Sequence, residues 1–219
     1  MKSVSENSKY VYCIIKSPEK SINFGNIGFQ GHEVYTLDCD DFCPVVSNEP
    51  FKKYEVDNDE EINIHQNVIN EVMKQYSIIP VAYGMIFKNK KLIKVSIRAG
   101  KQAIKKAITI VDNKVELGIK IFLPNDSERD EQKLGQCKTE SIERFGEIAS
   151  HSKNLKLFSS RLLMNTSYLV DREKIQTFSD EVEKFKLKYP EYKFQYSGPW
   201  PPYNFVDIHI LSNKKGGFR

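Results

Sequence analysis

The spacing of apolar residues in the first half of the chain predicts a mixture of strands and helices. Residues 10–15 form an unbroken β-branched and aromatic run, which is typical of a central strand buried on both faces. Shorter strands are predicted over residues 33–37, which alternate, and over residues 43–47. Residues 57–61 are acidic and precede apolar positions at helical spacing over residues 62–76. A helix is predicted there, because carboxylates stabilise helix N-termini.

The middle of the chain predicts one further strand and one long helix. Residues 78–87 are apolar and β-branched around Pro80, so they indicate a single strand. Residues 89–111 are ambiguous, because part of the segment alternates as a strand does while Ile97, Ile104 and Ile108 recur at helical spacing. The length of the segment favours one helix with a solvated lysine-rich face.

A turn signal at Asp112 and Asn113 predicts a boundary between two small domains, residues 1–112 and residues 113–219. Beyond it, periodicity predicts strands and helices in the order β-α-β-α-β. They are strand 115–122, helix 140–157, strand 162–170, helix 171–188 and strand 192–197. This order is that of a ferredoxin-like domain lacking one strand. The expected fold class is therefore α+β with two small domains, the second a modified ferredoxin-like domain.

Composition narrows the class of protein. The chain has 219 residues, of which 40% are hydrophobic and 28% are charged, with a net charge of +4 from intermixed signs. No apolar run approaches the ~20 residues that a membrane helix needs, and the polar first residues do not resemble a signal peptide. Four cysteines are too few for a disulfide framework. A cytosolic protein that binds neither membrane nor nucleic acid is expected.

Candidate catalytic and metal-binding residues are few. Cys39 and Cys43 are four apart, but no further zinc ligands follow at matching spacing, so buried thiols are the better interpretation. His65 lies on the apolar edge of a predicted helix without an indicated Ser, Cys or carboxylate partner. The glycines of residues 24–31 lack the lysine and Ser/Thr of a phosphate-binding loop. No enzyme activity, metal or cofactor is expected.

The most distinctive stretch is Ser-Gly-Pro-Trp-Pro-Pro-Tyr-Asn-Phe-Val at residues 197–206, which contains the chain's single tryptophan. Its prolines fix their own φ angles and donate no backbone hydrogen bond, so the stretch is rigid. Rings on so rigid a support either bury against the protein or contact a partner, and burial of Trp200 between the domains is the favoured hypothesis. The candidate structural or partner-binding residues are Gly198, Pro199, Trp200, Pro201, Pro202, Tyr203 and Phe205.

This stretch resembles the C-terminal signature of the gas vesicle protein F/L family. Other segments are similar to that family in the same order along the chain. They are Val-Val-Ser at residues 45–47, the strand with Pro80, Val81, Gly84 and Phe87, Val-Glu-Leu-Gly-Ile-Lys-Ile at residues 115–121, and residues 165–170. The strand with Pro80 departs from the family pattern by placing Tyr83 at a position where the family has phenylalanine.

The resemblance implies a non-enzymatic accessory or minor structural protein of gas vesicles, which are gas-filled protein shells inside prokaryotic cells. The implied partners are the hydrophobic main shell subunit, of the GvpA type, and other gas vesicle accessory proteins. The implied location is the gas vesicle within the cytoplasm. Two alternatives remain at this point. One is a ligand-binding or small enzyme domain on a ferredoxin-like scaffold, and the other is a nucleic-acid-binding module with aromatics on an open sheet.

Overall fold

The structure is a computed structural model that describes residues 8–123 and 130–206. The described chain divides into two compact units. One contains the residues up to Asp112 together with Val206, and the other spans Asn113–Phe205. Both units contain helices and sheet, so the prediction of a mixed α and β protein is confirmed. That each unit is a domain able to fold alone stays a prediction. No helix in the described ranges combines the length and the apolar character needed to cross a membrane.

The first unit is built on a sheet whose central strand is the apolar run near the N-terminus, as predicted. This strand, β1 (Lys9–Lys16), is buried along almost all of its length. It pairs antiparallel with β4 on one side and with β5 and β6 on the other. The strands follow the order β2 (Asn23–Gly25), β3 (Val34–Thr36), β4 (Phe42–Asn48), β1 and β5 (Ile78–Pro80), with β6 (Ile86–Phe87) also on β1.

Three helices accompany this sheet: α1 (Asp59–Met73), α2 (Lys90–Ala99) and α3 (Lys101–Val111). The Asn58 side chain caps α1 by accepting a hydrogen bond from the Glu61 N–H at 3.1 Å. The prediction of a single helix over residues 89–111 is wrong, because Gly100 interrupts the helix: it caps the C-terminus of α2 and the N-terminus of α3. The single strand predicted over residues 78–87 is also wrong, because Gly84 takes φ +88 between β5 and β6.

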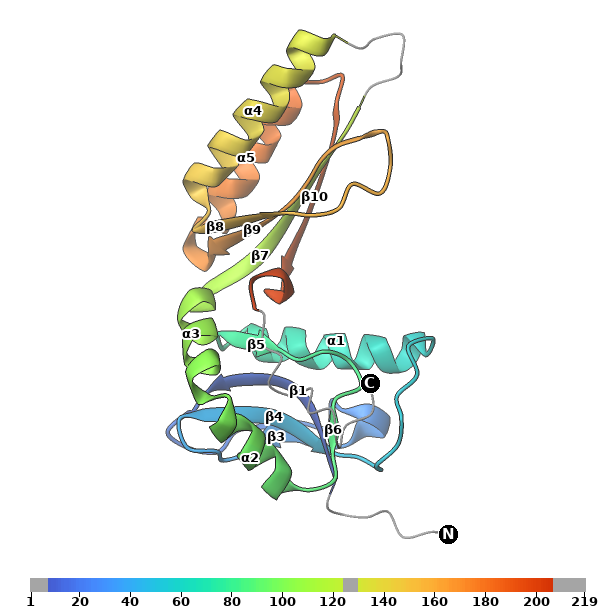
Figure 1. The fold of residues 1–219 in the computed structure, drawn as a ribbon, viewed down its shortest axis with the longest axis vertical. Coiled ribbons are helices and arrows are strands. Elements are labelled where there is room, and N and C mark those ends of the chain that lie inside the picture. Colours follow the sequence, from blue (N-terminus) through green and yellow to red (C-terminus); the bar gives the residue numbers. More distant parts are fainter. Residues whose placement is uncertain (1–7, 124–129, 207–219) are drawn as a thin grey trace. The chain divides into compact units, whose positions relative to one another are not determined.

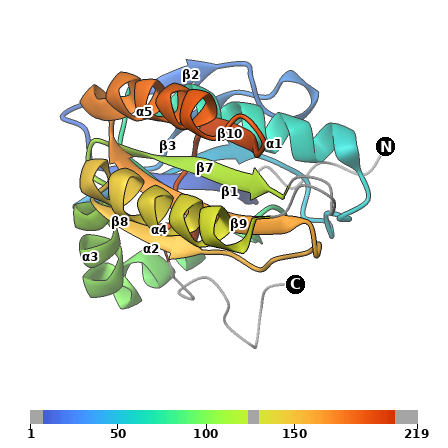
Figure 2. The ribbon, with the colours of Figure 1, turned by 90° about the horizontal axis from the view of Figure 1, so that it is seen from above.

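The second unit is a four-stranded antiparallel sheet in the order β10-β7-β9-β8. Figures 1 and 2 both show α4 and α5 side by side over one face of this sheet. Along the chain, β7 (Lys114–Phe122), α4 (Glu131–Ile148), β8 (His151–Asn154), β9 (Leu162–Asp171), α5 (Ile175–Lys188) and β10 (Lys193–Trp200) follow one another, with short 3₁₀ turns at Arg172–Lys174 and Tyr203–Phe205.

The prediction of a missing strand is therefore wrong, because β8 supplies it. The helix predicted over residues 140–157 includes the residues of β8, whereas α4 ends at Ile148. All four residues of β8 are polar and exposed, so its sequence has no apolar alternation to indicate a strand. What holds it is backbone pairing to β9, from His151 opposite Leu169 to Asn154 opposite Thr166.

Alternation along β7 separates the two faces of this second sheet. Val115, Leu117, Ile119 and Ile121 are fully buried, and their partners on β9 include Tyr168. Tyr168 is in ring contact with the phenylalanines of α4 and α5, so this face forms the core beneath the helices. The intervening positions of β7 face the other way, and they position the segment described next.

Candidate functional site

The proline-aromatic stretch continues the edge strand β10 of the second unit. Ser197 pairs with Gly118 of β7, the register then shifts, and Trp200 lies opposite Glu116. An edge position is where a sheet tolerates proline, because Pro199 has no N–H to contribute to a ladder. The Gly198–Pro199 peptide bond is cis. The expectation that this stretch stays out of the middle of a sheet is thus confirmed.

Gly198 is required by the backbone at this bend. Its φ is +118, which side-chain-bearing residues rarely adopt. A Cβ atom built there would lie 2.8 Å from the backbone oxygen of Glu116 on the neighbouring strand. Any other residue would push the bend away from β7.

A buried carboxylate fixes the turn that follows Trp200. Glu116 is 5% exposed and lies on the sheet face opposite the helices. It accepts hydrogen bonds from the Ser167 hydroxyl at 2.7 Å, from the Asn204 N–H at 3.0 Å and from the Asn204 side-chain amide at 2.5 Å. The Lys153 ammonium donates to the Asn204 carbonyl at 3.1 Å. Three strands therefore hold the 3₁₀ turn Tyr203–Phe205 against the sheet.

Sequence reasoning missed Glu116, Ser167, Asn204 and Lys153 as members of this anchor. A signal was present in the sequence: Glu116 is a carboxylate between the apolar positions Val115 and Leu117 of a strand. A buried carboxylate in such a place needs several donors, since an unpaired one is costly.

Trp200 is not fully enclosed, and the expectation that it packs between the two domains stays a prediction. Its side chain is 49% exposed, and Tyr203 is 36% exposed. Trp200 ends an edge strand just after a register shift, so it has a neighbouring strand on one side only. Pro201 and Pro202 are the buried members of the stretch, while Phe205 is half-buried.

His65 is a structural residue, as predicted. It is fully buried on α1, where its Nε2 lies 3.1 Å from the Val81 carbonyl and its Nδ1 lies 3.0 Å from the Tyr10 hydroxyl. A carbonyl oxygen only accepts, so Nε2 carries the proton and Nδ1 accepts from Tyr10. Burial lowers the pKa of His65 to about 4, partly opposed by the bond to Val81, so the ring is neutral.

The cysteines are buried thiols. Cys13, Cys39 and Cys43 are buried in the first unit, and Cys137 is buried in the second. Burial raises the pKa of the Cys39 thiol to about 11, which disfavours the thiolate that metal binding requires. Across the described ranges, no three His, Cys, Asp or Glu side chains cluster in a way that could hold a metal ion.

Comparison with known proteins identifies the class to which this architecture belongs. The family described as "Gas vesicle synthesis protein GvpL/GvpF" matches residues 8–141 and 127–207, which together cover most of the chain. The chain belongs to this family, so the predicted family resemblance is confirmed. Its role is related to gas vesicles.

Among curated relatives, gas vesicle protein F1 of Halobacterium salinarum is 32% identical over 213 residues, covering 96% of this chain and 98% of the relative. Gas vesicle protein F of Haloferax mediterranei is 30% identical, over 95% and 97% of the two chains. The fold resembles the crystal structure of GvpF from Anabaena sp. PCC7120, with a TM-score of 0.81 at 18% identity over 92% and 97% of the chains. GvpF from Microcystis aeruginosa gives a TM-score of 0.78 at 16% identity over 92% and 99%.

Proposed function

We propose that this protein is a non-enzymatic accessory or minor structural component that binds the hydrophobic main shell subunit, of the GvpA type, and supports gas vesicle assembly. It acts in the cytoplasm at the forming vesicle, beside other gas vesicle accessory proteins. Family membership over nearly the whole chain supports the gas vesicle role. The single observation that favours binding of an apolar partner is the pair of exposed rings on the anchored segment.

Folding of the monomer alone does not explain why Trp200 and Tyr203 are exposed. A large ring left in water adds little to folding and raises the risk of aggregation, so such rings commonly mark contact surfaces. Here the support is rigid, because Pro199 and Pro201 flank Trp200 and Glu116 anchors the turn beyond it. A rigid support lowers the entropy that is lost when a partner binds. The anchored segment, Gly198–Phe205 as a group, is thus proposed as the contact site.

The scaffold carrying this segment is proposed to be a ferredoxin-like domain. The element order β-α-β-β-α-β, with its helices on one sheet face, supports that class. We further propose that the chain comprises two domains that meet at Asp112. A small soluble protein of this kind would cover apolar edges of the shell subunit until those edges pair with one another.

Coexpression with the shell subunit tests the proposal. The expected result is that the shell subunit stays soluble and co-purifies with the wild-type protein, whereas the double variant Trp200→Ala, Tyr203→Ala loses most of the shell subunit while retaining its melting temperature. Leu187→Ala is the matched control, because Leu187 is an apolar residue of the same unit that is 83% exposed on α5. Equal recovery of the shell subunit with all three proteins would refute the proposed contact site.

A further inference from the structure

In the part of the chain that the structure describes, the outer side of β10 is an unpaired sheet edge. Residues 193–197 pair antiparallel with β7 on their inner side, and β10 is the terminal strand of the sheet. Across the described ranges, these residues form no backbone hydrogen bond on the outer side. Alternate N–H and C=O groups therefore point away from the sheet and are able to pair with another strand.

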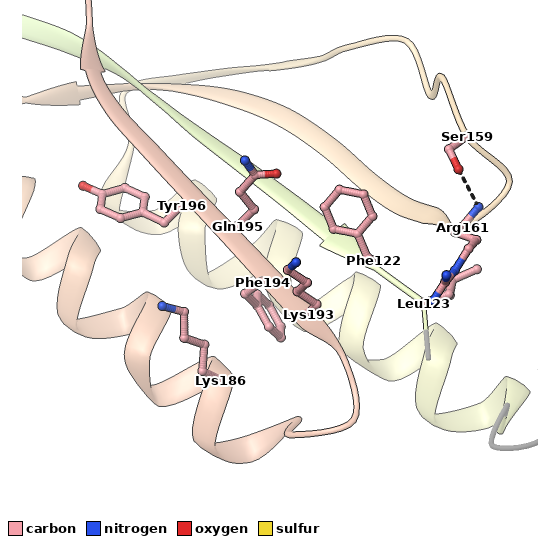
Figure 3. A pocket seen from close by; sticks show the side chains of 9 residues that line it. All are labelled: Phe122, Leu123, Ser159, Arg161, Lys186, Lys193, Phe194, Gln195 and Tyr196. Atoms are coloured by element: carbon pink, nitrogen blue, oxygen red, sulfur yellow. Dashed lines mark hydrogen bonds between the residues drawn. The ribbon is translucent and has the colours of Figure 1, made fainter. Parts of the chain in front are cut away.

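A hollow of about 710 Å³ lies along this edge, near the start of the strand (Figure 3). Its walls come from β7, β10, α5 and the residues just before β9. They contain Arg161, Lys186 and Lys193 but no carboxylate among the lining residues. Lys186 is paired with Glu183 of its own helix at 2.7 Å, and Lys193 forms no ion pair with any other residue that the structure describes. The hollow is therefore positively charged overall.

The two sides of the edge differ in chemistry. Directly opposite residues of paired strands share a face, so Lys193 and Gln195 share one with Phe122 and Lys120. The Lys120 ammonium lies 5.2 Å from the ring centroid of Phe158 on the same side of the unit. The other face presents Phe194 and Tyr196, which point toward α5. One face of the edge is cationic and the other is aromatic.

We propose that the edge Lys193–Ser197 binds an extended, acidic segment of a partner protein as a fifth strand of this sheet. The partner strand alternates. On one face its carboxylates lie beside Lys193 and Gln195, with the Lys120 ammonium one strand further into the sheet, and on the other face its apolar side chains lie beside Phe194 and Tyr196. Backbone pairing supplies the bonds, while the two faces select the sequence. These residues precede the anchored segment in the chain, and the inference does not rest on the function proposed above.

Lysine and proline at a sheet edge commonly prevent pairing with unrelated strands. Here they are consistent with an edge that accepts only an acidic strand. Lys193 repels a cationic strand, including edges rich in lysine, but attracts an acidic one. Pro199 lies beyond the free residues and limits the length of any added strand to the segment before it. The edge is thus expected to pair with a short acidic strand and to disfavour other strands.

The test uses the full-length wild-type protein and three short capped peptides. In the first peptide glutamate alternates with valine, in the second lysine alternates with valine, and the third has the composition of the first with the glutamates and valines in separate blocks. Binding is measured by titration calorimetry and by backbone amide NMR at low and high salt. The expected result is binding of the first peptide about tenfold tighter than either control at low salt, a gap that shrinks at high salt, and protection of amides in residues 193–197.

Charge reversal provides the second arm. The variant Lys193→Glu, Lys120→Glu is expected to reverse the preference, so that the lysine-valine peptide binds better than the glutamate-valine peptide. Lys138→Glu, an exposed α4 lysine on the helix side of the sheet, is the control and should leave the preference unchanged. Because the peptide comparison on wild-type protein stands alone, poor folding of the double variant would not leave the proposal undecided.

Several outcomes would overturn the inference. These are absence of binding by the alternating acidic peptide, equal affinity for all three peptides, or binding that leaves the amides of residues 193–197 unprotected. A single-stranded oligonucleotide that protects the same amides and displaces the acidic peptide would assign the hollow to nucleic acid instead. Protection that rises with protein concentration without peptide would assign the edge to a second copy of the chain.

Discussion

Replacing His65 by glutamine should remove a defined part of the pH dependence of stability. His65 is enclosed by the rings of Tyr10, Tyr12 and Tyr83, and both of its nitrogens are hydrogen-bonded as the neutral tautomer. The Tyr10 oxygen in turn accepts from the Gly84 N–H at 2.8 Å. A proton on Nδ1 would remove the acceptor that Tyr10 uses, and both side chains are fully buried. Acidification should therefore destabilise the first unit.

The magnitude follows from linkage between protonation and folding. The folded pKa of His65 is about 4, against a reference value of 6.5. The unfolded chain binds the proton first, so stability from this residue is complete above pH ~6.5 and falls as the pH decreases toward ~4, below which it levels off. At 1.36 kcal/mol per pH unit the loss is about 2 kcal/mol at pH ~5 and about 3 kcal/mol at pH ~4.

Amide hydrogen exchange of β1, measured near pH 7 and near pH 5, is the appropriate assay because it reports on the first unit alone. The buried Glu49, whose pKa is raised by burial, contributes with the opposite sign, so the informative quantity is the difference between wild type and His65→Gln. His151→Gln, at an exposed histidine of β8, is the control. Equal pH dependence in wild type and His65→Gln, or a native His65 ring that titrates near pH 6.5, would refute the reasoning.

Two further predictions concern the anchor of the proline-aromatic segment. Glu116→Ala should raise exchange of the Asn204 amide strongly and lower the free energy of unfolding of the second unit by about 2–3 kcal/mol, because three donors lose their acceptor; unchanged Asn204 exchange would contradict the anchor. Gly198→Ala should destabilise by about 1–3 kcal/mol through a positive φ and a Cβ against backbone. Its control, Gly135→Ala in α4, should stabilise by up to ~1 kcal/mol, since open space surrounds that glycine; a thermal melt in which the two variants shift alike would contradict the backbone argument.

The elements that the sequence predicted correctly are those whose own composition determines them. The buried run of β1 and the acidic start of α1 belong to this group, because apolar continuity and helix capping act locally. Gly100 and Gly84 break the predicted helix and strand at single residues, and such breaks depend on tertiary contacts, as the bond from the Gly84 N–H to Tyr10 illustrates. The spacing of apolar residues alone does not predict these interruptions.

The residue types of the proline-aromatic segment are enough to identify it as a candidate site. They do not predict its exposure or the residues that anchor it. Prolines and aromatics identified residues 198–205, but the exposure of Trp200 depends on the register shift beside Glu116 and on the edge position of β10. The anchor joins Glu116, Ser167 and Asn204, which are far apart in the sequence. The polar strand β8 was missed for the same reason, since only pairing with β9 makes it a strand. Long-range pairing is what a single sequence leaves undetermined.

The central claim, that the anchored aromatic segment contacts the shell subunit, is tested most directly by site-specific photocrosslinking. A photoreactive phenylalanine analogue replaces Trp200 in one protein and Leu187 in another, and each is coexpressed with the shell subunit. Both positions are exposed side chains of the same unit, at 49% and 83%. The account predicts a covalent product with the shell subunit from position 200 and little or none from position 187. A product from position 187 alone, or equal yields from both positions, would contradict it.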